Sequence, residues 1–158
     1  MKSCIKLICC DVDGTMTDGT IYVGSEGELF KGFNVKDGMG IGLALQEGVK
    51  FAIITGRESE IVSIRSKELN ITEIYQDCSN KTEIVKQLKA KYNLSREEVA
   101  FIGDDVNDIV VKDEVGLLAI VRDGHNKAKA LADVVLETEG GRGAVREFVD
   151  RFILDEDN

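Results

Sequence analysis

The sequence predicts an α/β fold built on one doubly wound parallel β-sheet, with helices on both faces and a small β-hairpin beside it. Strand-like and helix-like segments alternate along the 158 residues, which is typical of parallel strands joined by crossover helices. The strongest strand segments are apolar runs without polar alternation, as expected for strands covered on both faces. No proline, repeat or linker divides the chain, so we expect a single domain over residues 1–158.

The first elements are a buried strand, a hairpin and a helix. Ile5–Cys10 is short, apolar and followed by turn-forming residues, which indicates a buried strand. Thr20–Val23 and Glu28–Phe33 flank the turn signal GSEG at Gly24–Gly27, which predicts a hairpin. From Asp37 onward, apolar residues recur at helical spacing, although glycines interrupt the pattern.

The middle of the chain repeats the alternation of strand and helix. Lys50–Thr55 is a second buried strand, and Ile61–Leu69 carries apolar residues at helical spacing. Ile71–Tyr75 is a short strand. Ser79 or Asn80 could then cap the next helix, because both side chains can accept a hydrogen bond from a helix N-terminus.

The last part of the chain alternates in the same way. The expected elements are a strand at Val99–Gly103, a helix at Asp105–Asp113, a strand at Gly116–Val121, a helix at Asn126–Leu131, a strand at Asp133–Leu136 and a helix at Ala144–Ile153. We expect a hairpin flap over about residues 19–34 and a C-terminal tail over about residues 140–158.

The composition excludes several classes of partner. A net charge of −9 argues against nucleic acid and anionic membranes. No segment reaches the roughly 20 apolar residues of a membrane span, and the first apolar run is too short for a signal peptide. We therefore expect a cytoplasmic protein. The cysteines, at positions 4, 9, 10 and 78, lack zinc-site spacing and are expected to be free thiols.

Acidic, hydroxyl and lysine side chains fall at the ends of the predicted strands. Asp11 and Asp13 follow the first strand, Thr55 ends the second, and Asp104 follows Val99–Gly103. Ligands bind at the carboxyl ends of parallel strands, so these groups are expected to meet, together with Lys81. Carboxylates that share a crevice suit a magnesium ion.

For the magnesium site we assign the side chains of Asp11 and Asp104 and the main-chain carbonyl of Asp13, and Asp105 or Asp108 could assist. Asp11 could then attack phosphorus as a nucleophile.

The other candidates complete a phosphoryl-transfer site. Asp13 could protonate the leaving alcohol and later activate water. Thr55 and backbone amides would bind phosphoryl oxygens, and Lys81 would neutralise the charge of the intermediate.

Four segments match a known superfamily in the right order. They are DVDGT (Asp11–Thr15), AIIT (Ala52–Thr55), Lys81 and GDDVND (Gly103–Asp108), and they resemble the motifs of the haloacid dehalogenase-like phosphatases. The resemblance implies Asp11 as the nucleophile, Asp13 as the acid/base and magnesium as the cofactor.

A narrower resemblance runs the length of the chain. Asp13–Ile41, Ile53–Arg57, Ile74–Lys81 and Gly140–Phe148 are similar to the 3-deoxy-D-manno-octulosonate 8-phosphate phosphatases. This implies an octulosonate phosphate substrate, a core without a cap domain, and a homotetramer in which a neighbouring subunit helps to cover the active site. The short span between the first strand and the first helix also leaves room only for a hairpin.

The sequence constrains the identity of the sugar acid substrate less than it constrains the type of reaction. A substrate carboxylate needs a cation, for which Arg57, Arg65 and Arg142 are candidates; Gly56 and Asn107 complete the predicted substrate-binding set. Arg57 resembles the octulosonate type, whereas relatives acting on nine-carbon sugar acids can carry an acid there. A nine-carbon sugar acid phosphate therefore stays the alternative substrate.

Alternatives from another class are a phospho-receiver domain and a non-catalytic regulatory domain. Receivers normally carry the phosphorylated aspartate at the end of a later strand, where this chain has Thr55–Gly56. The sequence therefore disfavours a receiver, and the intact set of acids argues against a non-catalytic domain.

Overall fold

The computed structural model describes residues 3–156, so the outermost residues of the predicted domain, 1–2 and 157–158, lie outside the described part. Six parallel strands form one sheet in the order β5-β4-β1-β6-β7-β8. Their bounds are β1 Leu7–Cys10, β4 Lys50–Ile54, β5 Glu73–Tyr75, β6 Val99–Gly103, β7 Leu117–Ile120 and β8 Val134–Val135. From β1 the chain builds outward to β5, then crosses back to β6. The topological switch point of the sheet therefore lies between β1 and β6.

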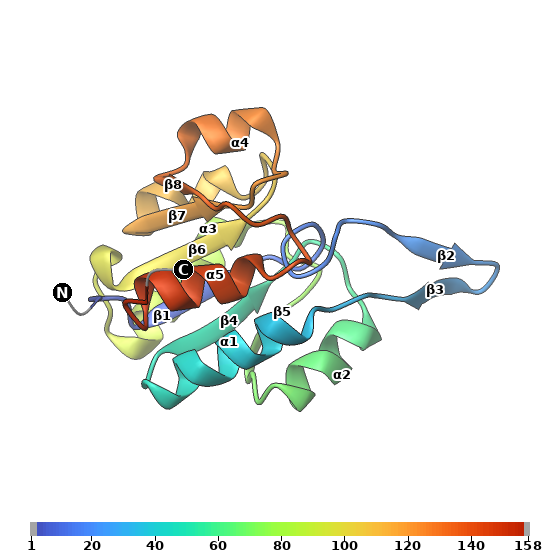
Figure 1. Cartoon of the computed structure of the whole chain (residues 1–158), viewed down its shortest axis with the longest axis horizontal. Coiled ribbons are helices and arrows are strands. Elements are labelled where there is room, and N and C mark those ends of the chain that lie inside the picture. The colour runs from blue at the N-terminus through green and yellow to red at the C-terminus, as the bar shows by residue number, and fades with distance from the viewer. Residues whose placement is uncertain (1–2, 157–158) are drawn as a thin grey trace.

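Helices cover both faces of this sheet, as Figure 1 shows. On one face lie α1 (Val35–Gln46), α2 (Glu60–Glu68) and α5 (Ala144–Phe152), with α1 packed against α5. The opposite face is covered by α3 (Lys81–Tyr92), α4 (Asn126–Leu131) and the 3₁₀ helix η2 (Ile109–Glu114). A further 3₁₀ turn, η1 (Arg96–Glu98), precedes β6. The predicted doubly wound parallel sheet is confirmed.

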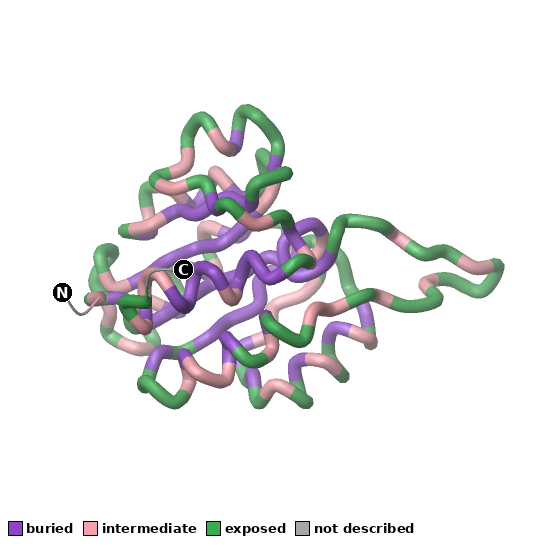
Figure 2. Tube along the Cα trace, in the orientation of Figure 1, coloured by how far each residue is buried: buried purple, intermediate pink, exposed green. Residues whose placement is uncertain are grey.

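The burial of strand β1 on both faces explains why its sequence is apolar without polar alternation. Ile8 and Cys10 belong to the core beneath α1 and α5, whereas Leu7 and Cys9 belong to the core beneath α3. All four are fully buried, because successive strand residues point to opposite faces and both faces are covered. Figure 2 shows this buried centre running along the strands.

The hairpin extends away from the sheet. It consists of β2 (Tyr22–Gly24) and β3 (Gly27–Phe30), which pair antiparallel across the predicted turn. Gly27 has a φ of +118°, which only glycine adopts easily. The hairpin is the only strand structure between β1 and α1 in the described chain, and it is mostly exposed (Figures 1 and 2). No cap domain is present between those two elements.

The predicted helix at Asp105–Asp113 is wrong. The chain instead turns after β6 and forms the 3₁₀ helix η2. The carboxylate of Asp108 accepts hydrogen bonds from the backbone N–H groups of Asp104 and Asp105, which fixes a turn in place of a helical start. The β-branched run Ile109–Val111 also disfavours an α-helix. The predicted strand Val99–Gly103 and helix Asn126–Leu131 have the observed bounds, and the remaining predicted bounds differ from the observed ones by a few residues.

The glycines of α1 have a packing role. A Cβ on Gly40 would lie 3.1 Å from the Cα of Arg146 on α5, and one on Gly38 would lie 2.7 Å from the guanidinium of Arg65 on α2. The glycines therefore allow close packing on both sides of α1, which outweighs their low helix propensity. The helix begins at Val35 because the Asn34 side chain accepts a hydrogen bond from the Lys36 N–H.

Two smaller expectations concern caps and cysteines. Asn80, and not Ser79, caps α3 by accepting a hydrogen bond from the Glu83 N–H. The four cysteines are free thiols, as expected. Over residues 3–156, none of the helices combines the length and the apolar character needed to span a membrane.

Candidate active site

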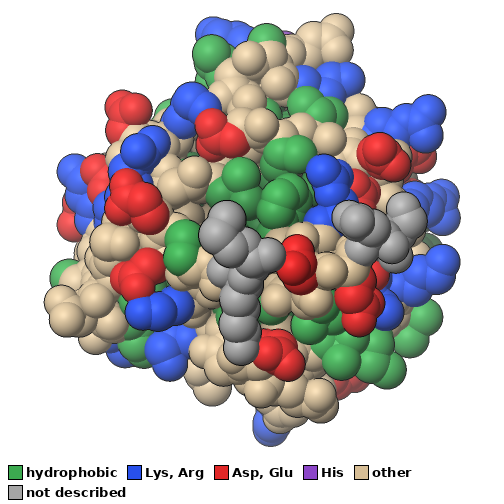
Figure 3. Space-filling view, turned by 60° about the vertical axis from the view of Figure 1, so that its left-hand side comes forward, with side chains coloured by type: hydrophobic (Ala, Val, Ile, Leu, Met, Phe, Trp, Pro, Cys, Tyr) green, Lys and Arg blue, Asp and Glu red, His purple; other side chains and the backbone are tan. Residues whose placement is uncertain are grey.

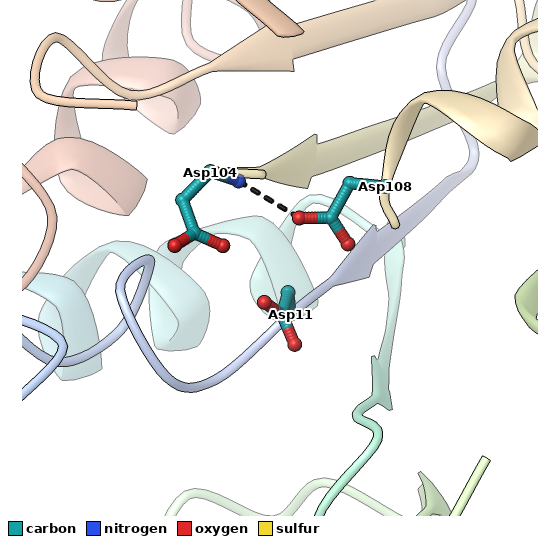
Figure 4. A group of neighbouring side chains, drawn as sticks. All are labelled: Asp11, Asp104 and Asp108. Carbon is teal, nitrogen blue, oxygen red and sulfur yellow. Dashed lines mark hydrogen bonds between the residues drawn. The ribbon is translucent and has the colours of Figure 1, made fainter. Parts of the chain in front are cut away.

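Three carboxylates meet at the switch point of the sheet. Asp11 directly follows β1, and its backbone N–H donates to the carbonyl of Ile102 on β6. Asp104 directly follows β6, so the pairing of these two strands brings both side chains together. One carboxylate oxygen from each of Asp11, Asp104 and Asp108 lies within 4.8 Å of the others (Figure 4). The sequence-predicted ligands Asp11 and Asp104 are therefore neighbours.

Asp108 organises the turn that carries Asp104. Its Oδ2 accepts the N–H groups of Asp104 at 2.9 Å and Asp105 at 3.2 Å, and its Oδ1 lies 2.6 Å from Lys81 Nζ. Asp108 is fully buried. Because both of its oxygens are engaged by the chain, Asp108 holds the turn and the lysine in place. Asp105 is exposed and accepts a hydrogen bond from Val106, so it does not join the cluster.

Lys81 is the cation of the cluster. It is the first residue of α3, and its side chain is 3% exposed. Besides Asp108, its Nζ contacts Asp11 Oδ1 at 3.2 Å. Burial works to lower the pKa of Lys81, but the carboxylates of Asp11 and Asp108 outweigh it and raise the pKa. Lys81 therefore stays charged beside Asp11.

The electrostatics of the cluster favour a divalent cation. Burial, reinforced by the neighbouring carboxylates, raises the pKa values of Asp11 and Asp104. Two neighbouring acids that resist ionisation together are well matched to a hard cation, whose charge offsets the repulsion between their carboxylates. Gly14 keeps the space beside them open: a Cβ there would lie 1.9 Å from Asp104 Oδ2. The donor set fits magnesium, and the carbonyl role of Asp13 stays a prediction.

The side chain of Asp13 lies apart from the three carboxylates. Its Oδ1 is 2.6 Å from Lys31 Nζ, and its Oδ2 is 3.9 Å from Arg57 Nε. Lys31 follows β3 at the base of the hairpin, and it also pairs with Glu28 at 2.7 Å. Sequence reasoning missed Lys31. Its only signal was its position inside the resembling segment Asp13–Ile41.

Thr55 and its neighbours line the end of β4. Thr55 is buried, its N–H donates to the Tyr75 carbonyl, and its own carbonyl accepts the Cys78 N–H. Gly56 is exposed, and the Arg57 side chain is 54% exposed. This edge therefore offers a hydroxyl and an accessible guanidinium beside Asp13. Their roles in substrate binding stay predictions.

Three other predicted substrate-binding residues lie outside the cluster. Arg65 pairs with Glu68 at 3.2 Å and packs over the Phe33 ring. Arg142 lies in a cavity with Lys36 and the first turn of α5. Asn107 is exposed in the turn before η2. Among the described residues, no ion pair joins either arginine to Asp11, Asp13 or Asp104.

The opposite end of the sheet carries none of the predicted site residues. A cavity of about 640 Å³ opens there, and Ile5, Leu117 and Phe152 are among its lining residues. Figure 3 shows this end of the molecule, where hydrophobic side chains gather among acidic and basic ones. The predicted catalytic and metal-binding residues therefore lie at the carboxyl edge of the sheet.

A cluster of carboxylates with a buried lysine, at the switch point of such a sheet, suits a protein that binds a divalent cation and transfers a phosphoryl group. The family model of the haloacid dehalogenase-like hydrolases matches residues 58–148. The 3-deoxy-D-manno-octulosonate 8-phosphate phosphatase KdsC of Escherichia coli strain K12 is 45% identical over 150 residues, which cover 95% of this chain and 80% of that protein. The chain belongs to the 3-deoxy-D-manno-octulosonate 8-phosphate phosphatase family of the haloacid dehalogenase-like hydrolases.

Solved structures agree with this assignment. The 3-deoxy-D-manno-octulosonate 8-phosphate phosphatase from Yersinia pestis superposes with a TM-score of 0.93 at 43% identity, covering 96% of this chain and 82% of that one. The enzyme from Moraxella catarrhalis, solved with a magnesium ion, a phosphate ion and a KDO molecule, has a TM-score of 0.93 at 38% identity, covering 98% and 88%. The resemblance inferred from the sequence is confirmed, and the receiver alternative has no support.

Proposed function

We propose that this chain is a magnesium-dependent phosphatase that hydrolyses 3-deoxy-D-manno-octulosonate 8-phosphate (KDO 8-phosphate). The observation that carries the proposal is the meeting of Asp11, Asp104 and Lys81 at the switch point, with Asp13 two residues from Asp11. The relatives described above act on this substrate or bind magnesium, phosphate and KDO. Magnesium, when bound, would neutralise phosphoryl charge, and Asp11, Asp104 and the Asp13 carbonyl would hold it.

The side chains of the chain divide the reaction between them. A carboxylate oxygen of Asp11 attacks phosphorus, and the ester P–O bond breaks as Asp13 gives its proton to the departing sugar oxygen. Asp13, now a carboxylate, takes a proton from water. That water attacks the phosphorus, the bond to Asp11 breaks and inorganic phosphate leaves. Lys81 and Thr55 stabilise the charge on the phosphoryl oxygens throughout.

A substrate panel tests the proposal. We expect kcat/KM for KDO 8-phosphate to exceed that for nine-carbon sugar acid 9-phosphates by about 10-fold or more, the scale of a few lost contacts in a binding site. Arg57, exposed beside Asp13, would contact the substrate carboxylate, whereas relatives acting on nine-carbon sugar acids can carry an acid at that position. Simple sugar phosphates serve as controls. A clear preference for a nine-carbon substrate would replace the proposed substrate by the alternative.

The hairpin supports a homotetramer whose subunits complete one another's sites. Four of its side chains, Tyr22, Val23, Leu29 and Phe30, are large, apolar and exposed. An isolated two-stranded hairpin is at best marginally stable in water, so a neighbouring subunit would both cover these side chains and shield the site. Sedimentation equilibrium of the wild type is expected to give the tetramer mass, and Leu29→Asp is expected to lower it. A monomeric wild type would refute the tetramer.

The remaining expectations stay predictions. We propose that the whole chain acts as one catalytic domain. Arg65 and Arg142 would contact the substrate when the subunits of the tetramer assemble. Gly56 and Asn107 would contact the phosphate group of the substrate. A cytoplasmic location is consistent with this role.

A further inference from the structure

A buried lysine at the base of the hairpin has no part in the mechanism above. The side chain of Lys31 is 2% exposed, although lysine is almost never fully buried unless it is paired. Its Nζ lies 2.6 Å from Asp13 Oδ1 and 2.7 Å from Glu28 Oε1. Two carboxylates therefore hold one ammonium group between the first loop and the hairpin.

Glu28, the second partner of the lysine, connects the hairpin to the residue that precedes α2. Glu28 Oε2 accepts a hydrogen bond of 2.6 Å from Ser59 Oγ, and Ser59 is the residue that precedes α2. The backbone N–H of Ser59 in turn donates to Gln76. The Ser59 end of this chain of contacts is thus anchored in the body of the protein, and the other end, beyond Lys31, is the carboxylate of Asp13.

We infer that Lys31 is a positioning residue for Asp13, an inference that rests on the proposed function. Lys31 fixes Oδ1 of Asp13, which leaves Oδ2, on the side of Arg57, as the oxygen that exchanges the proton with the leaving group. Hydrogen bonds to charged groups of this length are strong and directional. Because Lys31 belongs to the hairpin, the orientation of the acid/base depends on the hairpin being in place.

The leaving group provides a readout that a purely structural role would not change. A sugar alkoxide is a poor leaving group, and it needs the proton of Asp13 as the P–O bond breaks. p-Nitrophenolate leaves without protonation. The constant kcat/KM reports the steps up to phosphoryl transfer, so misplacing Asp13 should lower it for the sugar ester far more than for p-nitrophenyl phosphate.

The experiment compares these two esters for Lys31→Met in the full-length magnesium-loaded enzyme. We expect kcat/KM for the sugar phosphate to fall about 30-fold, part of the 10²–10⁴-fold that general acid catalysis supplies, and for the aryl phosphate to fall less than about 3-fold. Lys31→Arg, which keeps the charge, is expected to restore most of the loss. Ser59→Ala is the comparison variant: it removes the hydrogen bond to Glu28 but keeps both ion pairs of Lys31, so it should change the ratio of the two esters far less than Lys31→Met does.

Equal losses on both esters, or a change of ratio in Ser59→Ala as large as that in Lys31→Met, would overturn the role of Lys31. Lys31→Gln keeps a polar group at the buried position, and the same ratio decides the question if Lys31→Met does not fold. The sugar phosphate is the one that the wild type hydrolyses best in the substrate panel. Failure of KDO 8-phosphate in that panel would refute the proposed substrate, whereas the ester ratio of the variants judges Lys31 separately.

Discussion

Replacing Asp11 by asparagine is expected to reduce phosphate release to the background rate. The amide cannot act as a nucleophile toward phosphorus, and removal of an enzyme nucleophile costs on the order of 10⁴-fold or more in kcat. The fold is expected to persist, because Asp11 is one of three crowded carboxylates and burial already disfavours its charge. Losing that charge relieves repulsion, while the contact between Lys81 and Asp108 remains.

Steady-state phosphate release and thermal unfolding check this prediction together. Asp113→Asn makes the same chemical change on the exposed surface of η2, and it should change neither activity nor stability. Normal turnover of Asp11→Asn with magnesium would show that another group attacks phosphorus. A loss of activity accompanied by unfolding would contradict the expectation that the fold persists.

The position of Asp11 could be predicted from sequence because it depends on local pattern and general topology. The apolar run before it marks a strand that is covered on both faces, and parallel strands end at a common edge. The same reasoning places Asp104 after Val99–Gly103. It needs no knowledge of which strands are neighbours, since every strand end lies at that edge.

The turn after β6 shows where such reasoning ends. Acidic residues near a helix start usually interact with the helix N-terminus, so GDDVND looked like a capped helix. In the structure Asp108 instead folds back onto the N–H groups of Asp104 and Asp105 and reaches Lys81. The turn in place of a helix depends on Lys81, which lies 27 residues away in the sequence. A hydrophobic periodicity describes only local segments and cannot predict such a contact.

The cations of the site illustrate the same limit. Lys31 reaches Asp13 only because the hairpin returns to the first loop, and nothing in its immediate sequence marks it. Arg65 looked equally suitable, yet its helix directs it toward Phe33 and Glu68. Spacing along the chain predicts the element that carries an arginine or a lysine. The side chain's partner depends on tertiary packing.

Replacing Lys81 by methionine is expected to destabilise the magnesium-free protein by about 3–5 kcal/mol, the usual cost of removing one member of a buried ion pair. The substitution leaves Asp11 and Asp108 buried beside Asp104 without their cation. Chemical denaturation measures the free energy of unfolding. Lys112→Met is the control, because its ion pair with Asp133 has side chains 36% and 39% exposed and should contribute no more than about 1 kcal/mol.

Magnesium separates the electrostatic role of Lys81 from its catalytic role. The lysine Nζ lies 3.2 Å from Asp11 Oδ1, so it competes with a metal ion for the same negative charge. Lys81→Met is therefore expected to bind magnesium more tightly than the wild type in calorimetric titration, and magnesium should restore much of its lost stability. Its turnover should nevertheless stay low, because no cation remains to stabilise the phosphoryl oxygens from that side. Weaker magnesium binding in the variant would contradict this expectation. It would mean that Lys81 chiefly holds the carboxylates in place, because Asp108 and the strand ends would then be insufficient to keep Asp11 and Asp104 in position.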